Sequence, residues 1–76
     1  MKDKEQFLKN LGKHLRKIRE GQGMSLREME LNCDMDRQLI SKIELGQRNV
    51  SATSLKKYAD ALGLEFEELF KGFRNK

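Results

Sequence analysis

A chain of 76 residues has room for one small core, because a chain of this length buries only about 60% of its unfolded surface. The length therefore argues against a deep substrate cavity and an elaborate active site. Hydrophobic and charged residues each make up 37% and proline is absent, which favours a single all-α domain over residues 1–76 rather than a strand-rich sandwich. The formal net charge of +4 makes polyanions plausible partners.

Residues that would support other chemistry are few. The one cysteine, Cys33, cannot form an internal disulfide and has no Cys or His cluster beside it to bind a metal. Ser25, His14 and Cys33 form no nucleophile–base motif. The chain starts without an apolar signal core, and no apolar run approaches the ~20 residues of a membrane span. We expect a protein inside the cell that is no enzyme, with no metal, cofactor, membrane or small-molecule effector site.

The spacing of apolar residues predicts a first helix over about residues 5–20. Its apolar side consists of Phe7, Leu8, Leu11, Leu15 and Ile18. Gly21 and Gly23 should end it, since glycine is common just past a helix end. Basic residues crowd this third of the chain whereas the last third is acidic, so one side of the fold could face phosphate groups.

A capping box predicts the start of the second helix. The hydroxyl of Ser25 can accept a hydrogen bond from the backbone amide three residues on, while the carboxylate of Glu28 reaches back. The helix should begin at Leu26 and end at about residue 32 or 33. Met29 and Cys33 give it a buried side.

A short polar break separates the second helix from the third. Asp36 is a good N-cap for a helix that ends near Leu45 and Gly46. The tight turn before it should need one residue at positive φ. We expect Asp34 in that position, because Asp tolerates the left-handed conformation better than most residues.

Two further elements complete a predicted bundle of five helices. Ser51 can cap a fourth helix that ends at Gly63, and its buried side consists of Leu55, Tyr58, Ala59 and Leu62. The fifth, over about residues 66–72, places on one stripe Phe66, Leu69, Phe70 and Phe73. This is more apolar surface than so small a core needs. The N-terminal helix and this stripe are candidate dimer surfaces, and closure of the core is the alternative for the stripe.

The third helix carries polar residues that the fold does not require. Arg37 and Ser41 are four residues apart, as are Gln38 and Lys42, so all four project from one face. A helix, a turn of three or four residues and a second helix of this kind are typical of side chains that enter the DNA major groove. Arg37 could contact guanine and Gln38 adenine, each with two hydrogen bonds, and Lys42 a guanine or a phosphate. A solvated helix face is the alternative.

These residues resemble the repressor-like helix-turn-helix domains of the Cro and lambda-repressor type, the XRE family. The resemblance covers residues 11–70 and rests on three segments in the order of the family: LGKHLRKIREGQGMS, DRQLISKIELGQRN and SLKKYADALGLEFEELF. The pattern DRxxIS followed by IExGxRN is also similar to the small restriction-modification controller proteins. The resemblance implies a compact five-helix lambda-repressor-like domain, with its core at about 8–70 and its helix-turn-helix at about 25–45.

Site residues follow from the resemblance by position. It implies base readout by Arg37, Gln38, Ser41 and Lys42. It implies contacts to phosphate by Arg27, Arg48, Asn49 and Ser51, with Arg16 and Lys13 at the edge. It also implies that Arg19 pairs with Glu44, which has a physical logic of its own, since a basic residue favours a helix C-terminus and its planar fork fits a carboxylate.

Three positions depart from the family pattern. Leu26 stands where the family usually has Gln, so its side chain cannot contact phosphate. Glu30 stands where a small residue lets two helices approach, so it must extend outward or widen the crossing. Asp34 stands where the turn usually has Gly. Glu30 and Asp34 add negative charge near the expected DNA side.

The resemblance implies a transcriptional regulator of a bacterium or phage, located in the cytoplasm and on the nucleoid when bound. Two subunits would place their recognition helices in successive major grooves of an inverted-repeat operator on double-stranded DNA, about 34 Å apart, and the dimer would block or recruit polymerase. The alternative is a protein-interaction module, such as an antitoxin or an antirepressor-like partner, that uses the apolar last element. A steep salt dependence of DNA affinity would distinguish the two.

Overall fold

Four α-helices and one 3₁₀ helix follow one another in the computed structural model, which describes residues 2–74. They are α1 (Lys2–Gly21), α2 (Leu26–Asn32), α3 (Arg37–Glu44), α4 (Ala52–Leu62) and the 3₁₀ helix η1 (Phe66–Phe70). The predicted all-α class is confirmed. None of the helices in this range has the length and apolar character that a bilayer span requires.

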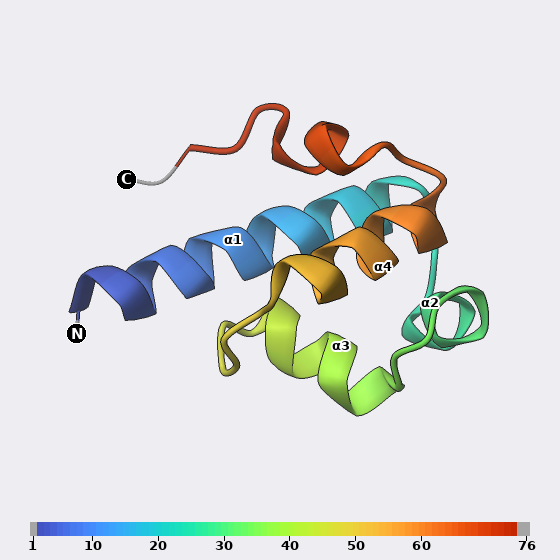
Figure 1. The fold of residues 1–76 in the computed structure, drawn as a ribbon, viewed down its shortest axis with the longest axis horizontal. Coiled ribbons are helices and arrows are strands. Elements are labelled where there is room, and N and C mark those ends of the chain that lie inside the picture. The colour runs from blue at the N-terminus through green and yellow to red at the C-terminus, as the bar shows by residue number, and fades with distance from the viewer. Residues whose placement is uncertain (1, 75–76) are drawn as a thin grey trace.

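The elements pack around a shared core, with α1 and α4 in the middle of the fold (Figure 1). Figure 1 shows α2 and α3 on one side of α1 and α4, while η1 and the C-terminal segment run along the opposite side. α3 packs against both α1 and α2, and α4 packs against α2 and η1. All five elements and the turn before α3 contribute buried side chains to the core: Leu11, Leu15, Met29, Met35, Ile40, Ile43, Leu55, Tyr58, Ala59, Ala61, Leu62 and Leu69.

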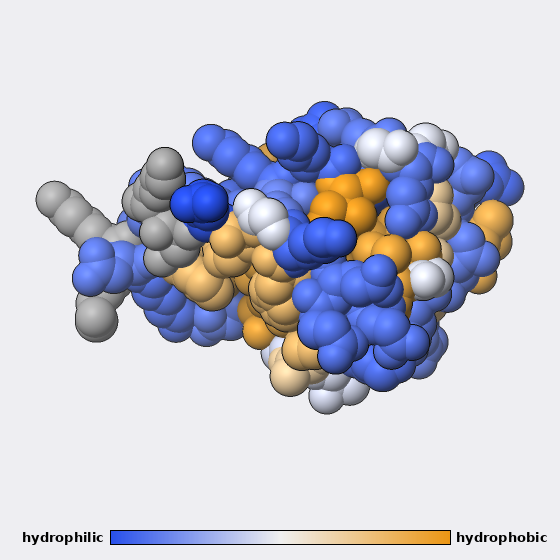
Figure 2. Space-filling model, turned by 90° about the horizontal axis from the view of Figure 1, so that it is seen from above, coloured by the Kyte–Doolittle hydropathy of each residue, from blue (hydrophilic) through white to orange (hydrophobic). Residues whose placement is uncertain are grey.

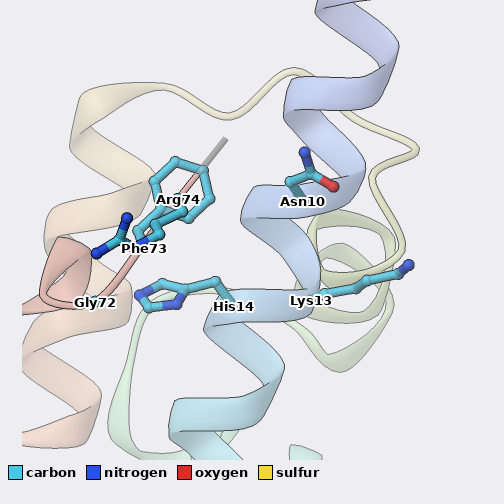
Figure 3. Close-up of a pocket in the computed structure, with 6 residues that line it drawn as sticks. All are labelled: Asn10, Lys13, His14, Gly72, Phe73 and Arg74. Carbon is cyan, nitrogen blue, oxygen red and sulfur yellow. The ribbon is translucent and has the colours of Figure 1, made fainter. Parts of the chain in front are cut away.

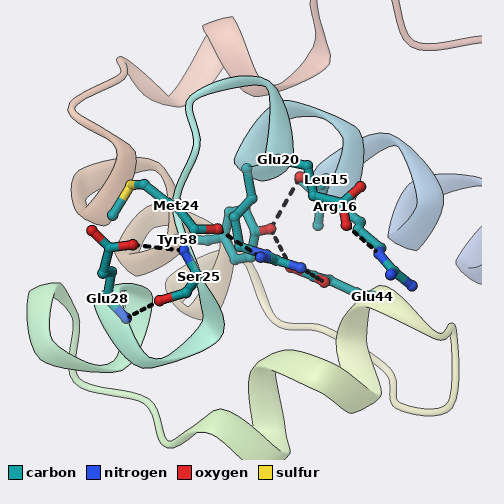
Figure 4. Close-up of polar contacts among 9 residues, drawn as sticks. Leu15, Arg16, Glu20, Met24, Ser25, Glu28, Glu44 and Tyr58 are labelled. Carbon is teal, nitrogen blue, oxygen red and sulfur yellow. Dashed lines mark hydrogen bonds and ion pairs between the residues drawn. The ribbon is translucent and has the colours of Figure 1, made fainter.

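Side-chain caps begin α2, α3 and α4 at the predicted residues. In the capping box, Glu28 donates its amide to Ser25 Oγ at 3.1 Å, and Ser25 donates its own amide to Glu28 Oε1 at 2.9 Å (Figure 4). The hydrogen bond from the Ser25 amide, and then one from the Ser25 side chain, lower the pKa of the Glu28 carboxyl. Asp36 accepts from the amide of Leu39 at 2.8 Å, and Ser51 accepts from that of residue 54 at 3.1 Å. Local hydrogen bonding therefore accounts for where these helices start.

The fifth predicted helix is wrong in type and length. Residues 66–70 form a 3₁₀ helix rather than an α-helix over 66–72, and i to i+3 bonds run from the Glu68 amide to Glu65 and from the Lys71 amide to Glu68. Lys71 is already extended (φ −63°, ψ 122°), and Gly72 follows at φ 79°. An α-helix this short would form few hydrogen bonds to offset the conformational entropy that its backbone loses. A short 3₁₀ turn is therefore favoured.

The turn between α2 and α3 does not use the predicted left-handed residue. Among residues 2–74 only glycines have positive φ, so Asp34 does not. Cys33 is extended (φ −142°, ψ 170°), as is Asp36 (φ −80°, ψ 165°). Two extended residues redirect the chain over four positions, and glycine is not required. The departure at Asp34 therefore costs no backbone strain.

Direct backbone contact holds the C-terminal end of α3 against α1. A Cβ added to Gly12 would lie 2.6 Å from both the carbonyl carbon of Glu44 and the carbonyl oxygen of Ile43. A Cβ on Gly46, whose φ is 74°, would lie 2.7 Å from the Cα of Lys9. Both distances are too short for any side chain. α1 and the end of α3 can approach this closely only because both positions are glycine.

A buried polar cluster joins α1, α3 and α4 at the same end of α3 (Figure 4). Arg19 donates from Nε and Nη2 to the two carboxylate oxygens of Glu44 at 2.8 and 3.0 Å. Its Nη1 donates to the carbonyl of Met24 at 2.7 Å. The Tyr58 hydroxyl donates to Glu44 Oε2 at 2.6 Å, with the carbonyl of Leu15 also within reach at 3.0 Å. The hydrogen bond to Glu44 raises the pKa of Arg19, so the guanidinium stays charged.

Alkaline unfolding should be coupled to Tyr58. Burial, and then the hydrogen bond to Glu44, raises the pKa of its hydroxyl far above the usual value. A raised folded-state pKa gives stability that is complete below about pH 10 and is lost as the pH rises toward the folded pKa. We expect the free energy of unfolding to fall above about pH 10, less steeply in Tyr58→Phe. The chain has one tyrosine, so tyrosinate absorbance reports it directly; ionisation near pH 10 in the folded protein would contradict this account.

Candidate nucleic-acid interface

The outer face of α3 opens on a hollow that contains the predicted base-reading residues. We call it the α3 hollow, and its lining consists of Leu26, Arg37, Gln38, Ser41, Lys42, Leu45 and Gln47. Arg37, Gln38 and Lys42 are exposed and Ser41 is half-buried. On the opposite face of α3, Ile40 is fully buried. The spacing of four residues therefore places the polar row outward and the apolar row in the core.

Three residues of the α3 hollow were not predicted as site residues. Leu26, one of the three departures from the family pattern, comes from α2. Leu45, 51% exposed, and Gln47 follow the end of α3. Leu45 is four residues after Ser41, which is the signal that could have placed it on the same face. Apolar side chains here could contact thymine methyl groups.

Glu30 extends from α2 toward the start of α3. Its Oε2 accepts from the amide of Arg37 at 3.1 Å, and its Oε1 lies 3.4 Å from Arg37 Nε. The departure at position 30 is thus accommodated by an outward carboxylate that meets a predicted base-reading residue.

The predicted phosphate contacts are more scattered. Arg48 lines a second hollow along α3 together with Asp36, Gln38, Leu39 and Lys42. Arg27 and Asn49 are exposed, and so is Ser51, whose hydroxyl already caps α4. Any phosphate contact at Ser51 would therefore come from the backbone amides at the start of α4.

Arg16 and Lys13 lie apart from the two hollows along α3. Arg16 forms an ion pair with Glu20 at 3.0 Å, and both side chains are 54% exposed. Lys13 lines a hollow between α1 and the C-terminal segment, although Figure 3 shows its side chain turned away from that segment and His14 turned toward it. His14 Nε2 lies 2.6 Å from the carbonyl of Leu69. Neither Arg16 nor Lys13 is among the residues that line the two hollows along α3.

Residues 15–69, more than half of the chain, match the family described as helix-turn-helix. The chain belongs to the helix-turn-helix family. The family resemblance expected from the sequence is confirmed. In this helix-turn-helix domain, α2 is the first helix of the motif, Cys33 to Asp36 form its turn, and α3 is its second helix.

Relatives of this helix-turn-helix domain are control proteins. The chain is 39% identical over 59 residues to the control protein C.BamHI of Bacillus amyloliquefaciens, an alignment that covers 76% of this chain and 73% of that protein. It is 40% identical over 60 residues to the control protein C.MunI of Mycoplasma sp, covering 78% and 81%. The crystal structure of the restriction-modification controller protein C.AhdI from Aeromonas hydrophila is similar, with 38% identity, a TM-score of 0.78 and coverage of 83% and 91%.

The aromatic stripe of the helix-turn-helix domain is only partly a surface. Leu69, predicted as part of it, is fully buried and belongs to the core, because η1 packs this side chain inward. Phe66, Phe70 and Phe73 are half-buried. The rings of Phe66 and Phe70 are 5.6 Å apart, and Phe73 meets Phe7 edge-on at 5.9 Å. Seen from the side of η1, apolar side chains gather between hydrophilic ones (Figure 2).

Metal-ligating side chains do not cluster in the described part of the chain, and its one cysteine is partly buried. Within residues 2–74, no group of three or more His, Cys, Asp and Glu side chains could hold a metal ion. Cys33 is half-buried, and burial raises the pKa of its thiol, which disfavours the reactive thiolate. The exposed polar surface along α3 is the candidate functional site.

Proposed function

We propose that this protein is a sequence-specific DNA-binding regulator of transcription that reads an inverted-repeat operator through the major groove as a homodimer. The observation that carries the proposal is the α3 hollow, in which Arg37, Gln38, Ser41 and Lys42 lie together on an exposed helix face. The similarity to control proteins supports it. We assign the whole of residues 1–76 to one domain with this function.

The residues have separate roles in this proposal. Arg37 and Gln38, in the first turn of α3, contact base edges, because bidentate contacts to guanine and adenine discriminate best. Ser41 and Lys42, one turn further, contact a base or a phosphate. Contacts to phosphate fix the register without reading sequence. We assign them to Arg27, Arg48, Asn49 and Ser51, and to Arg16 and Lys13 at the edge.

We assign the dimer surface to the exposed parts of Phe66, Phe70 and Phe73. Aromatic side chains are enriched in the centres of protein interfaces. Phe66 and Phe70 belong to η1, which lies across the fold from α3 (Figure 1). A dimer through this face leaves both copies of α3 free. The bound dimer would block or recruit polymerase at its operator.

Replacing Phe70 with serine should weaken self-association, because it removes apolar area from the proposed interface. Sedimentation equilibrium should show a shift toward monomer of about tenfold or more in dissociation constant, which corresponds to a hot-spot loss of ~1.4 kcal/mol. Leu31→Ser is the matched control, since Leu31 is 75% exposed on α2. A dimer that survives Phe70→Ser, or weakens equally in the control, would place the interface elsewhere.

The function is tested by selection of bound fragments from genomic DNA with the purified protein, at low and at moderate salt. Contacts to phosphate weaken steeply with salt whatever the sequence, so the two conditions separate charge attraction from base reading. We expect one inverted-repeat site to remain enriched at moderate salt. Binding that shows no sequence preference and is lost at moderate salt would overturn the proposal and favour a protein-interaction module.

A further inference from the structure

One carboxylate makes two contacts to the first residue of the recognition helix. Glu30 Oε2 accepts from the Arg37 amide at 3.1 Å, and Glu30 Oε1 lies 3.4 Å from Arg37 Nε. The side chain of Glu30 is 36% exposed, against 59% for Arg37. The carboxylate is thus partly shielded between the two helices, while the arginine reaches beyond it toward solvent.

Helix capping explains the first contact but not the second. The amide of Arg37 is one of the first N–H groups of α3, which have no partner within the helix. Asp36 accepts from the amide of Leu39, and Glu30 accepts from that of Arg37. A cap alone would need only the backbone contact. The second oxygen instead meets the side chain at Nε.

The second contact occurs at the edge of the α3 hollow. Leu26 and Glu30 are four residues apart on α2, so they share one helix face, and Leu26 lines the hollow together with Arg37. A guanidinium has five donors in a rigid planar fork. A partner at Nε leaves the two Nη groups available, and these can bind guanine O6 and N7 together.

We propose that Glu30 is a positioning residue for base recognition by Arg37. Its carboxylate holds the Nε edge of the guanidinium and thereby directs the Nη groups at one base pair. It also offsets the positive charge that would otherwise draw Arg37 to the nearest phosphate. This inference rests on the proposed DNA-binding function, and it assigns a role to a residue that reads no base itself.

Loss of the carboxylate should therefore reduce discrimination rather than affinity. Without it, the arginine samples more rotamers and can contact phosphate. In Glu30→Ala we expect the preference at one base pair of each half-site to fall at least about fivefold, the lower end of what one bidentate contact contributes. Affinity for unrelated DNA should rise, with a steeper salt dependence, because one more cation is free to release counterions.

The test measures relative affinities for the selected operator and for every single base-pair change in one half-site, at two salt concentrations. The set is wild type, Glu30→Ala, Glu30→Gln, Arg37→Ala and the double variant Glu30→Ala with Arg37→Ala. Alanine is a good helix former, so α2 should persist. Glu67→Ala is the control, since it removes the same charge from an exposed position on η1.

We expect both Glu30 variants to lose preference at the position that Arg37→Ala affects, and the double variant to lose no more than Arg37→Ala. Glutamine can still cap the amide but lacks the charge that holds the guanidinium. If only Glu30→Ala lost the base-pair preference, Glu30 would act merely as a helix cap, and the inference would be overturned. An unchanged profile in both variants, while wild type discriminates, would also overturn it. Failure of wild type to prefer any sequence would overturn the proposed function itself.

Discussion

Replacing Glu44 with glutamine should lower the free energy of unfolding by about 3 to 5 kcal/mol, because it leaves the buried charge of Arg19 without its partner. The side chains of Arg19 and Glu44 are 8% and 4% exposed, so water cannot replace the lost carboxylate. The Tyr58 hydroxyl would lose its charged acceptor as well. The loss is a large share of the total stability of about 4 to 11 kcal/mol typical for 76 residues. Urea unfolding gives the value directly.

An exposed ion pair on α1 provides the control for Glu44→Gln. Glu20 meets Arg16 at 3.0 Å, but both side chains are 54% exposed. Glu20→Gln makes the same chemical change in solvent, where such pairs contribute about 0 to 1 kcal/mol. We expect the melting temperature to fall by roughly 12 °C or more in Glu44→Gln, and only slightly in the control. Equal shifts would mean that the buried pair adds nothing to stability.

Replacing Arg37 with alanine should abolish the preference for one base pair in each operator half-site. The lost bidentate contact corresponds to about 1 to 3 kcal/mol, or roughly five- to 150-fold in relative affinity for that base pair. The fold should remain intact, since Arg37 is exposed and Asp36 still caps α3. Competition binding with operators changed one base pair at a time measures the effect. An unchanged specificity profile would remove Arg37 from the base-reading set.

Arg48→Ala is the matched control for this experiment. It removes the same charge from the second hollow along α3, where we assign contact to phosphate. Affinity should fall about equally for every sequence, and the salt dependence should become shallower by about one counterion. If Arg48→Ala instead relaxed the preference at one base pair, the assigned roles of the two arginines would be reversed.

The starts of α2, α3 and α4 could be predicted because they depend on neighbouring residues. Ser25 with Glu28, Asp36 and Ser51 each satisfy amides within their own turn, and such patterns can be read from a single sequence. The outward position of the polar row on α3 could likewise be predicted, because it follows from helical spacing. That this row contacts DNA remains a prediction.

Features that depend on contacts between distant segments were missed. Nothing in the residues around Gly12 or Gly46 shows that the end of α3 lies directly on α1. The hydrogen bond from Arg19 to the Met24 carbonyl, and the one from Tyr58 to the Glu44 carboxylate, likewise depend on the packing of three helices. Local reasoning also failed at the turn between α2 and α3, where no left-handed residue is used. The turn at Asp34 is made from extended residues.

The recognition helix is fixed at both ends. Asp36 and Glu30 hold its first turn, and the buried carboxylate of Glu44 and the close contact at Gly12 hold its last. An eight-residue helix would not persist alone in water, yet here it is ordered before any partner arrives. Association can then proceed as the docking of a rigid surface, without folding coupled to binding. The heat-capacity change on binding should therefore depend only on the surface area buried in the contact.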